Sequence, residues 1–250
     1  MTATTGAAVR ALRLADTAEA ADLAAFLGRL IRYDRAAAVR LQAGGGAVAV
    51  FGRPPAFEVL AIRTARLRDV GAGSVAGPGS VAGPGSVEVP VELDVTVSAG
   101  ELLEAIDELT GGFGLPAAVT GPPWTGVLPP RGGWQQVPGL PGPDGLRQAV
   151  AAAVTEFRTR DEALPAAHRD RAERDRIGRE IWSRTVGATG LPLRAVHAAQ
   201  SVGFLRPMPE DAPVALLRAG AWMRLRTLYG SIAVRTGGAG GIGGLSVTPM

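Results

Sequence analysis

Alternation between apolar and polar residues over residues 87–97 is the sequence feature that most restricts the fold. Valine or leucine occupies every odd position from Val87 to Val97, and three acidic residues stand between them. A two-residue period places the apolar side chains on one face of a strand. The segment therefore predicts a β-strand with one buried face and one acidic, solvated face. Because Pro90 cannot donate a hydrogen bond to a neighbouring strand, an edge position or a bulge is favoured.

Helix-capping patterns mark the start of two predicted helices. Ser98 and Glu101 have the capping-box spacing directly after the strand, and the apolar residues that follow have helical spacing up to Gly111. Asp16 and Glu19 have the same capping spacing, with Thr17 as an alternative cap, and predict a helix over residues 16–33. Three further helices are predicted after Asp144, after Pro165 and after Pro192.

Short apolar segments separated by Gly and Pro predict an antiparallel meander near each end of the chain. The predicted strands are residues 37–42, 47–51, 57–63, 214–218, 221–227 and 231–235. Each meander follows a predicted helix and ends in Ile-Arg-Thr or Val-Arg-Thr. The two could form one pseudo-symmetric sheet with helices on a face. The predicted class is α+β, with β-meanders at both ends and a helical segment between them.

The order of elements over residues 16–110 is similar to that of a known family. A helix, a meander, a strand and a Ser-capped helix follow one another in this way in one subdomain of bacterial sliding clamps. The same order is common in small α+β chaperones. No motif supports either, and the sequence assigns no family.

Composition shifts along the chain suggest five segments. They are a flexible N-terminus (1–15), an α+β unit (16–110), a connector rich in Gly, Pro and Trp (111–143), helices with a meander (144–236) and a disordered tail (237–250). Residues 75–86 contain Val-Ala-Gly-Pro-Gly-Ser twice, and we expect residues 71–86 to be a mobile loop.

Missing residue types exclude several chemistries. The chain has no Cys, and all 26 basic residues are Arg, since Lys is absent; Asn is also absent. Disulfides, thiolate nucleophiles, zinc fingers, a standard P-loop and a Schiff-base lysine are thereby excluded. The formal charge is +3 and the pI is about 10.4, which argues only weakly for nucleic acid because arginine keeps its proton.

Location and cofactors are predicted from absent signals. No apolar run approaches the ~20 residues that cross a bilayer, and residues 1–14 lack the apolar stretch of a signal peptide. We expect a cytoplasmic protein without a membrane span. Gly238, Gly240 and Gly243 have the dinucleotide-binding spacing, but no helix can follow them before Met250, so no cofactor is predicted. His168 and His197, the two histidines, are expected to be surface or half-buried residues, and no metal site is predicted.

Carboxylates of the Ser98 helix could hold a divalent cation or do acid–base chemistry, or form a docking patch for a basic partner. We expect solvated faces instead. The residues concerned are Glu101, Glu104, Asp107 and Glu108, with Glu88, Glu92 and Asp94 on the strand.

The connector supplies the candidate protein-binding residues. Trp124 and Trp134 flank a Gly- and Pro-rich segment that contains Arg131, and they could anchor a partner or seal the protein's own core. No residue spacing points to catalysis. The predicted function is a non-catalytic interaction or assembly protein, chaperone-like, with a protein partner.

A nucleic-acid-binding regulator is the alternative. Three helices followed by a hairpin permit a winged-helix interpretation, with the helix after Pro192 in the major groove. Its polar residues are Arg194, His197 and Gln200, and Arg224, Arg226 and Arg235 would contact phosphates.

Overall fold

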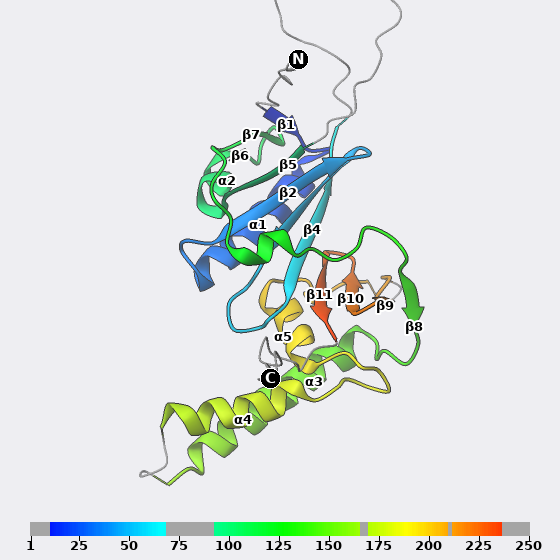
Figure 1. Cartoon of the computed structure of the whole chain (residues 1–250). Coiled ribbons are helices and arrows are strands. Elements are labelled where there is room, and N and C mark those ends of the chain that lie inside the picture. Colours follow the sequence, from blue (N-terminus) through cyan, green and yellow to red (C-terminus); the bar gives the residue numbers. More distant parts are fainter. Residues whose placement is uncertain (1–10, 69–92, 166–169, 210–211, 237–250) are drawn as a thin grey trace, which may run out of the picture. The chain divides into compact units, whose positions relative to one another are not determined.

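The structure is a computed structural model that describes residues 11–68, 93–165, 170–209 and 212–236. Its helices and antiparallel strands confirm the predicted α+β class (Figure 1). The duplicated segment, the first half of the 87–97 strand, His168 and the glycine-rich end fall outside these ranges. Within them, no helix is both long and apolar enough to cross a membrane.

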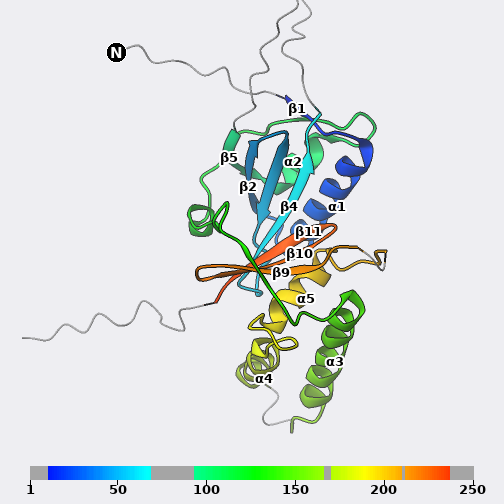
Figure 2. The same ribbon diagram turned by 90° about the vertical axis from the view of Figure 1, so that its right-hand side faces the viewer.

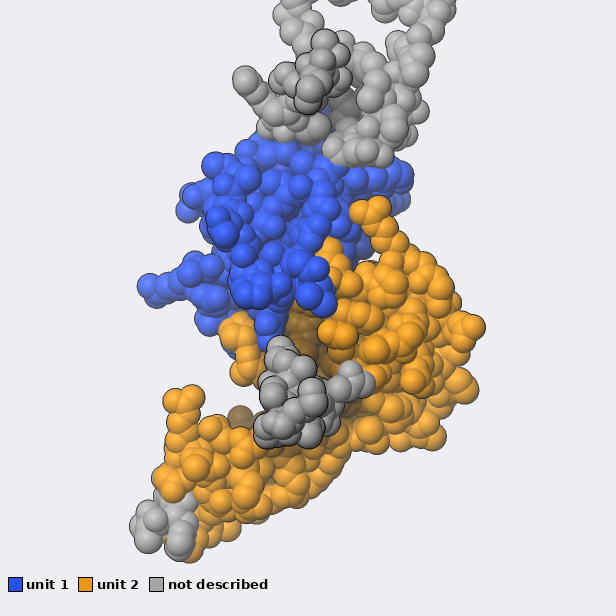
Figure 3. Space-filling model, viewed as in Figure 1, with its two compact units in different colours: residues 1–53, 62–127 blue, residues 54–61, 128–250 orange. Residues whose placement is uncertain are grey.

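The chain divides into two compact units (Figure 3). The first contains Met1–Arg53 and Ile62–Val127, and the second contains Pro54–Ala61 and Leu128–Met250. The second unit therefore includes eight residues from the N-terminal half of the sequence. Part of this segment forms a wall of the pocket described below.

The first unit contains a helix followed by an antiparallel meander. Its elements are β1 (Ala11–Arg13), α1 (Thr17–Tyr33), β2 (Ala38–Gly44), β3 (Ala47–Gly52), β4 (Leu60–Arg66), β5 (Leu93–Ser98), α2 (Ala99–Ala105), β6 (Ile106–Asp107), β7 (Gly112–Gly114) and the 3-10 helix η1 (Pro123–Gly126). The strand order is β5-β2-β3-β4, and β1-β7-β6 form a small second sheet. β5 lies at the edge of its sheet, with β2 as its neighbour, which agrees with the predicted edge position.

Apolar residues of α1 face the sheet of the first unit. Leu23, Phe26 and Leu27 are buried, as are Val39 and Leu41 of β2. Residues 11–13, which were expected to be flexible, form β1 and pair with β7. The pairing places Leu12 opposite Phe113, and both are buried.

Both predicted N-caps of the first unit, Asp16 and Ser98, are present. Asp16 Oδ1 accepts a hydrogen bond from the Glu19 N–H at 2.8 Å, and Ser98 Oγ accepts one from the Glu101 N–H at 3.4 Å. The helix after Ser98 is shorter than predicted. It ends at Ala105 because the Asp107 carboxylate accepts the N–H groups of Leu109 and Thr110 and turns the chain.

The second unit also combines helices with a meander (Figure 2). Its elements are β8 (Gln135–Val137), α3 (Pro143–Glu162), α4 (Arg171–Ser183), α5 (Leu193–Ser201), β9 (Ala215–Ala219), β10 (Trp222–Thr227) and β11 (Gly230–Arg235). The strand order is β11-β10-β9-β8, and α5 packs against β11, α3 and α4. The sheet contributes the buried residues Met223, Leu225 and Ile232 to the core, and α5 contributes Val196.

Two predicted helix starts in the second unit are wrong. α3 begins at Pro143, so Asp144 lies in the first turn and pairs with Arg147 instead of capping the helix. α4 begins at Arg171, not at Pro165. Its cap is Asp170, whose carboxylate accepts the Glu173 N–H at 2.9 Å and satisfies a free donor of the first turn.

Candidate functional site

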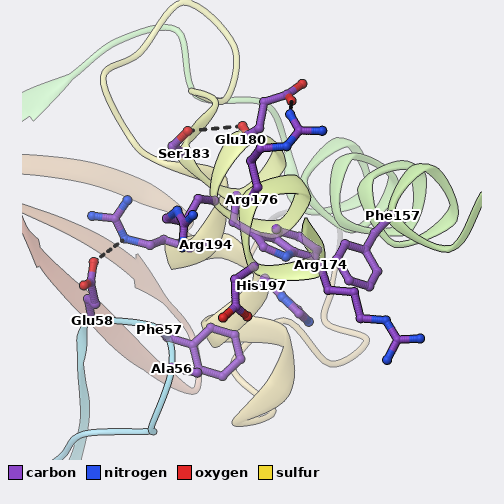
Figure 4. Close-up of a pocket in the computed structure, with 14 residues that line it drawn as sticks. Ala56, Phe57, Glu58, Phe157, Arg174, Arg176, Glu180, Ser183, Arg194 and His197 are labelled. Atoms are coloured by element: carbon purple, nitrogen blue, oxygen red, sulfur yellow. Dashed lines mark hydrogen bonds and ion pairs between the residues drawn. The ribbon is translucent and has the colours of Figure 1, made fainter. Parts of the chain in front are cut away.

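The second unit contains an open pocket of about 970 Å³ (Figure 4). Three segments form its walls: residues 56–58 before β4, the outer face of α4, and the side of α5 that carries Arg194 and His197. Phe157 of α3 adds an apolar side chain. All of these segments belong to the second unit, so the pocket is built within one compact body.

Residues 56–58 have an unusual backbone. Ala56 has a φ of 67° and Glu58 a φ of 53°, and no other non-glycine residue in the described ranges has a positive φ. The left-handed conformation costs an L-residue about 1–2 kcal/mol, so tertiary contacts must hold both residues in place. Phe57 lies between them and faces His197 in the pocket (Figure 4).

Three rings form the apolar wall. The His197 ring stacks on Trp182 at a centroid distance of 4.3 Å and an angle of 24°. The Phe57 ring meets His197 edge-on, at 5.1 Å and 83°. Burial lowers the pKa of His197, because the charged imidazolium is poorly solvated there. At neutral pH His197 is therefore an uncharged, flat part of the wall.

Two carboxylates of the pocket, Glu180 and Asp175, have arginine partners outside it. Glu180 accepts hydrogen bonds of 2.8 and 2.7 Å from Arg160, and these bonds lower the pKa of Glu180 to about 2. Asp175 lies 3.7 Å from Arg171. Glu180 and Asp175 therefore already have cationic partners.

Two arginines of the pocket retain donor capacity. Arg194 Nε is buried without a hydrogen-bond partner and lies 3.8 Å from a Glu58 oxygen, beyond hydrogen-bond distance. Arg179 is exposed and has no hydrogen bond or ion pair with any other residue that the structure describes. Both residues line the pocket.

The structure brings together only part of the predicted nucleic-acid set. Arg194 and His197 line the pocket, while Gln200 is exposed further along α5. α5 itself packs between α3, α4 and β11. Arg224 and Arg226 lie on β10, where Arg224 Nε donates to Ser231 Oγ at 2.8 Å.

The connector residues fall in different units. Trp124 is half-buried in η1 of the first unit, and Trp134 is half-buried in the second. The Trp134 indole donates to the Pro130 carbonyl at 3.0 Å, and its ring lies 5.9 Å from the Arg224 guanidinium. Arg131 is exposed between them in the sequence.

The carboxylates of α2 and β5 have separate partners or face solvent. Glu101, Glu104 and Glu108 are exposed. Asp94 accepts two hydrogen bonds from Arg40, and the Thr110 hydroxyl is the main cause of a lowered Asp107 pKa. Among the residues with described positions, no three His, Asp or Glu side chains gather in a way that would hold a metal ion.

Sequence reasoning missed the pocket residues Phe57, Trp182 and Arg179. It placed Phe57 in a strand over residues 57–63, whereas β4 begins at Leu60 because Glu58 is left-handed. One signal was available: Trp182 follows Ile181 in an otherwise strongly charged helix.

Comparisons with known proteins match both halves of the chain. Residues 7–126 match the family model of a domain of unknown function (DUF8010), and residues 129–239 match another (DUF8185). No curated protein matches. Among solved structures, the DNA polymerase sliding clamp from Pseudomonas aeruginosa with ligand is similar over 92% of this chain, with a TM-score of 0.46 and 11% identity. This chain spans 64% of that clamp, and at such a TM-score the similarity implies nothing about activity.

Proposed function

We propose that the chain is a non-catalytic protein-interaction protein whose pocket binds an extended, acidic segment of a partner. The observation that carries the proposal is the wall of Phe57, His197 and Trp182, held beside two arginines by a loop with two left-handed residues. Rigid aromatic side chains and arginine are the residues that most often dominate protein–protein binding energy. A preorganised loop lowers the entropic cost of binding.

Charge and shape define the partner segment. Carboxylates would accept hydrogen bonds from Arg194 and Arg179, the pair with spare donors. An apolar side chain between those carboxylates would lie against the aromatic wall. The preferred ligand is therefore a peptide with acidic residues on both sides of one large apolar residue.

Hydrogen bonding in the pocket favours binding over nucleophilic catalysis. The Ser183 hydroxyl donates to the Glu180 carbonyl at 3.1 Å, so its proton is directed away from His197. A serine nucleophile needs a general base within hydrogen-bond distance. The described part of the chain shows no hydroxyl bonded to His197.

Fluorescence anisotropy with labelled peptides tests the proposal. The probes are fluorescein-labelled decapeptides with Asp and Glu around one central Trp, Phe or Leu, and matched peptides with Lys in place of the acids. The acidic peptides are expected to bind saturably. Arg194→Ala combined with Arg179→Ala should weaken them at least about ten-fold, since each charged hydrogen bond contributes roughly 1.5–3 kcal/mol.

A matched variant separates the pocket from overall charge. Arg158 is exposed on α3 and is not part of the pocket, so Arg158→Ala should leave peptide affinity unchanged. Equal binding of acidic and basic peptides, or no saturable binding by any peptide, would overturn the proposal.

A further inference from the structure

The outer face of the second unit's sheet carries aromatic and cationic residues in register. Trp222, Arg224 and Arg226 alternate along β10 with the buried Met223, Leu225 and Thr227. The first three therefore share the face opposite the core. On β11, Arg235 is the partner of Trp222, so it lies on the same face.

Among the described residues, strands β8 to β11 of this sheet contain no Asp or Glu. From residue 212 to the end, the sequence contains four arginines and no Asp or Glu, and residues 109–143 contain Arg131 and no acid. Among described residues, Arg226 and Arg235 form no ion pair. The arrangement differs from α4, where the arginines alternate with carboxylates.

Arginine and tryptophan are close together at two places on the face. The Arg235 guanidinium lies 5.8 Å from the Trp222 ring, and that of Arg224 lies 5.9 Å from the Trp134 ring. Trp222 is half-buried, while Arg226 and Arg235 are exposed. An aromatic surface beside cations that have no carboxylate partners suits a flexible polyanion with stacking groups.

We infer that this sheet face binds single-stranded nucleic acid. Bases would stack on Trp222, and Arg226 and Arg235 would contact phosphates. Stacking on aromatic side chains in a positively charged groove is the general mode of single-strand binding. The duplex interpretation with α5 in a major groove is less favoured, because α5 packs against other elements.

Binding of a labelled 20-nucleotide oligo-dT, followed by anisotropy, tests the inference. Trp222→Ala and the double variant Arg226→Ala/Arg235→Ala are each expected to weaken binding by about ten-fold or more, since stacking contributes roughly 1–3 kcal/mol per base. With Arg226 and Arg235 in contact with phosphates, the slope of log K against log salt is expected to be about −1.4. Circular dichroism melting confirms that each variant is folded.

The matched control is Arg158→Ala/Arg171→Ala, which removes the same charge from the exposed surfaces of α3 and α4. This control should retain most of the affinity. An equal loss in the control, equal binding of a duplex or of poly-glutamate, or no saturable binding at low salt would overturn the inference. The peptide pocket uses other residues, so the two proposals can fail independently.

Discussion

Relief of backbone strain at Ala56 should stabilise the protein but weaken peptide binding. Glycine adopts a φ of 67° without the steric cost that alanine has, although it loses more entropy on folding. We expect Ala56→Gly to raise the free energy of unfolding by about 0.5–1 kcal/mol, measured by urea denaturation. The same change should weaken acidic-peptide binding, because the loop is less preorganised.

Ala117 provides the comparison, since it is exposed and has an ordinary backbone conformation. Ala117→Gly should lower the free energy of unfolding slightly. If Ala56→Gly destabilises the protein as much as Ala117→Gly does, the left-handed conformation at residue 56 is not a source of strain.

His197 makes stability depend on pH. Burial lowers the pKa of His197 in the folded state, so the unfolded chain binds its proton more tightly. The free energy of unfolding should therefore be greatest above the unfolded pKa of about 6.5 and decline as pH falls below it. His197→Phe keeps a ring against Trp182 and should reduce this decline between pH 7.5 and 5.5. Identical pH profiles for the variant and the wild type would contradict the assignment.

Several single-residue features could be predicted from sequence and others could not. The caps at Asp16 and Ser98 follow from a spacing of three residues, which the sequence displays directly. The left-handed conformation of Ala56 and Glu58 has no such signal, because neither is glycine. Their conformation is imposed by contacts with residues far along the chain.

α4 has a small apolar face and is also held to α3 by ion pairs. The buried apolar residues of α4 are Ile177 and Ile181. Arg160 of α3 bonds to Glu180 of α4, and Arg184 bonds to Glu156 across the same junction. These bonds run between the two helices, so the spacing of residues within one helix does not show them.

Glu180→Gln tests that network. The pKa of Glu180 is lowered to about 2, so its contribution to stability is present above about pH 4.5 and is lost as pH falls toward 2. At pH 7 the variant should have a lower melting temperature than the wild type, and the difference should shrink in 1 M NaCl because salt screens exposed charges.

Glu104→Gln is the control for this prediction, because Glu104 is exposed on α2. It should change the melting temperature little at either salt concentration. A Glu180→Gln effect that is unaffected by salt would indicate that packing, not charge, joins α3 to α4.

At the scale of the whole molecule, residues 54–61 come from the N-terminal half of the sequence but belong to the second compact unit. Phe57 and Glu58 contact His197 and Arg194, which lie beyond the boundary between Val127 and Leu128. The sequence placed a connector at 111–143 but did not show that the N-terminal half supplies part of the second unit. The composition of residues 54–61 does not indicate that they belong to the second unit.

A protease site inserted between Val127 and Leu128 tests this organisation. After cleavage, the two pieces should elute together in size-exclusion chromatography, because residues 54–61 remain bound in the second unit. Phe57→Ala should promote their separation. Complete separation of the wild-type pieces in native buffer would contradict the assignment of residues 54–61 to the second unit.

Peptide binding in the pocket can be observed by nuclear magnetic resonance of the ¹³C-labelled His197 ring. On titration with the best acidic peptide, we expect the His197 signals to shift saturably, with the affinity measured by anisotropy. Arg194→Ala should abolish the shift at the same peptide concentration, and Arg158→Ala should not. Saturated peptide binding with an unchanged His197 signal would show that the peptide does not bind in the pocket.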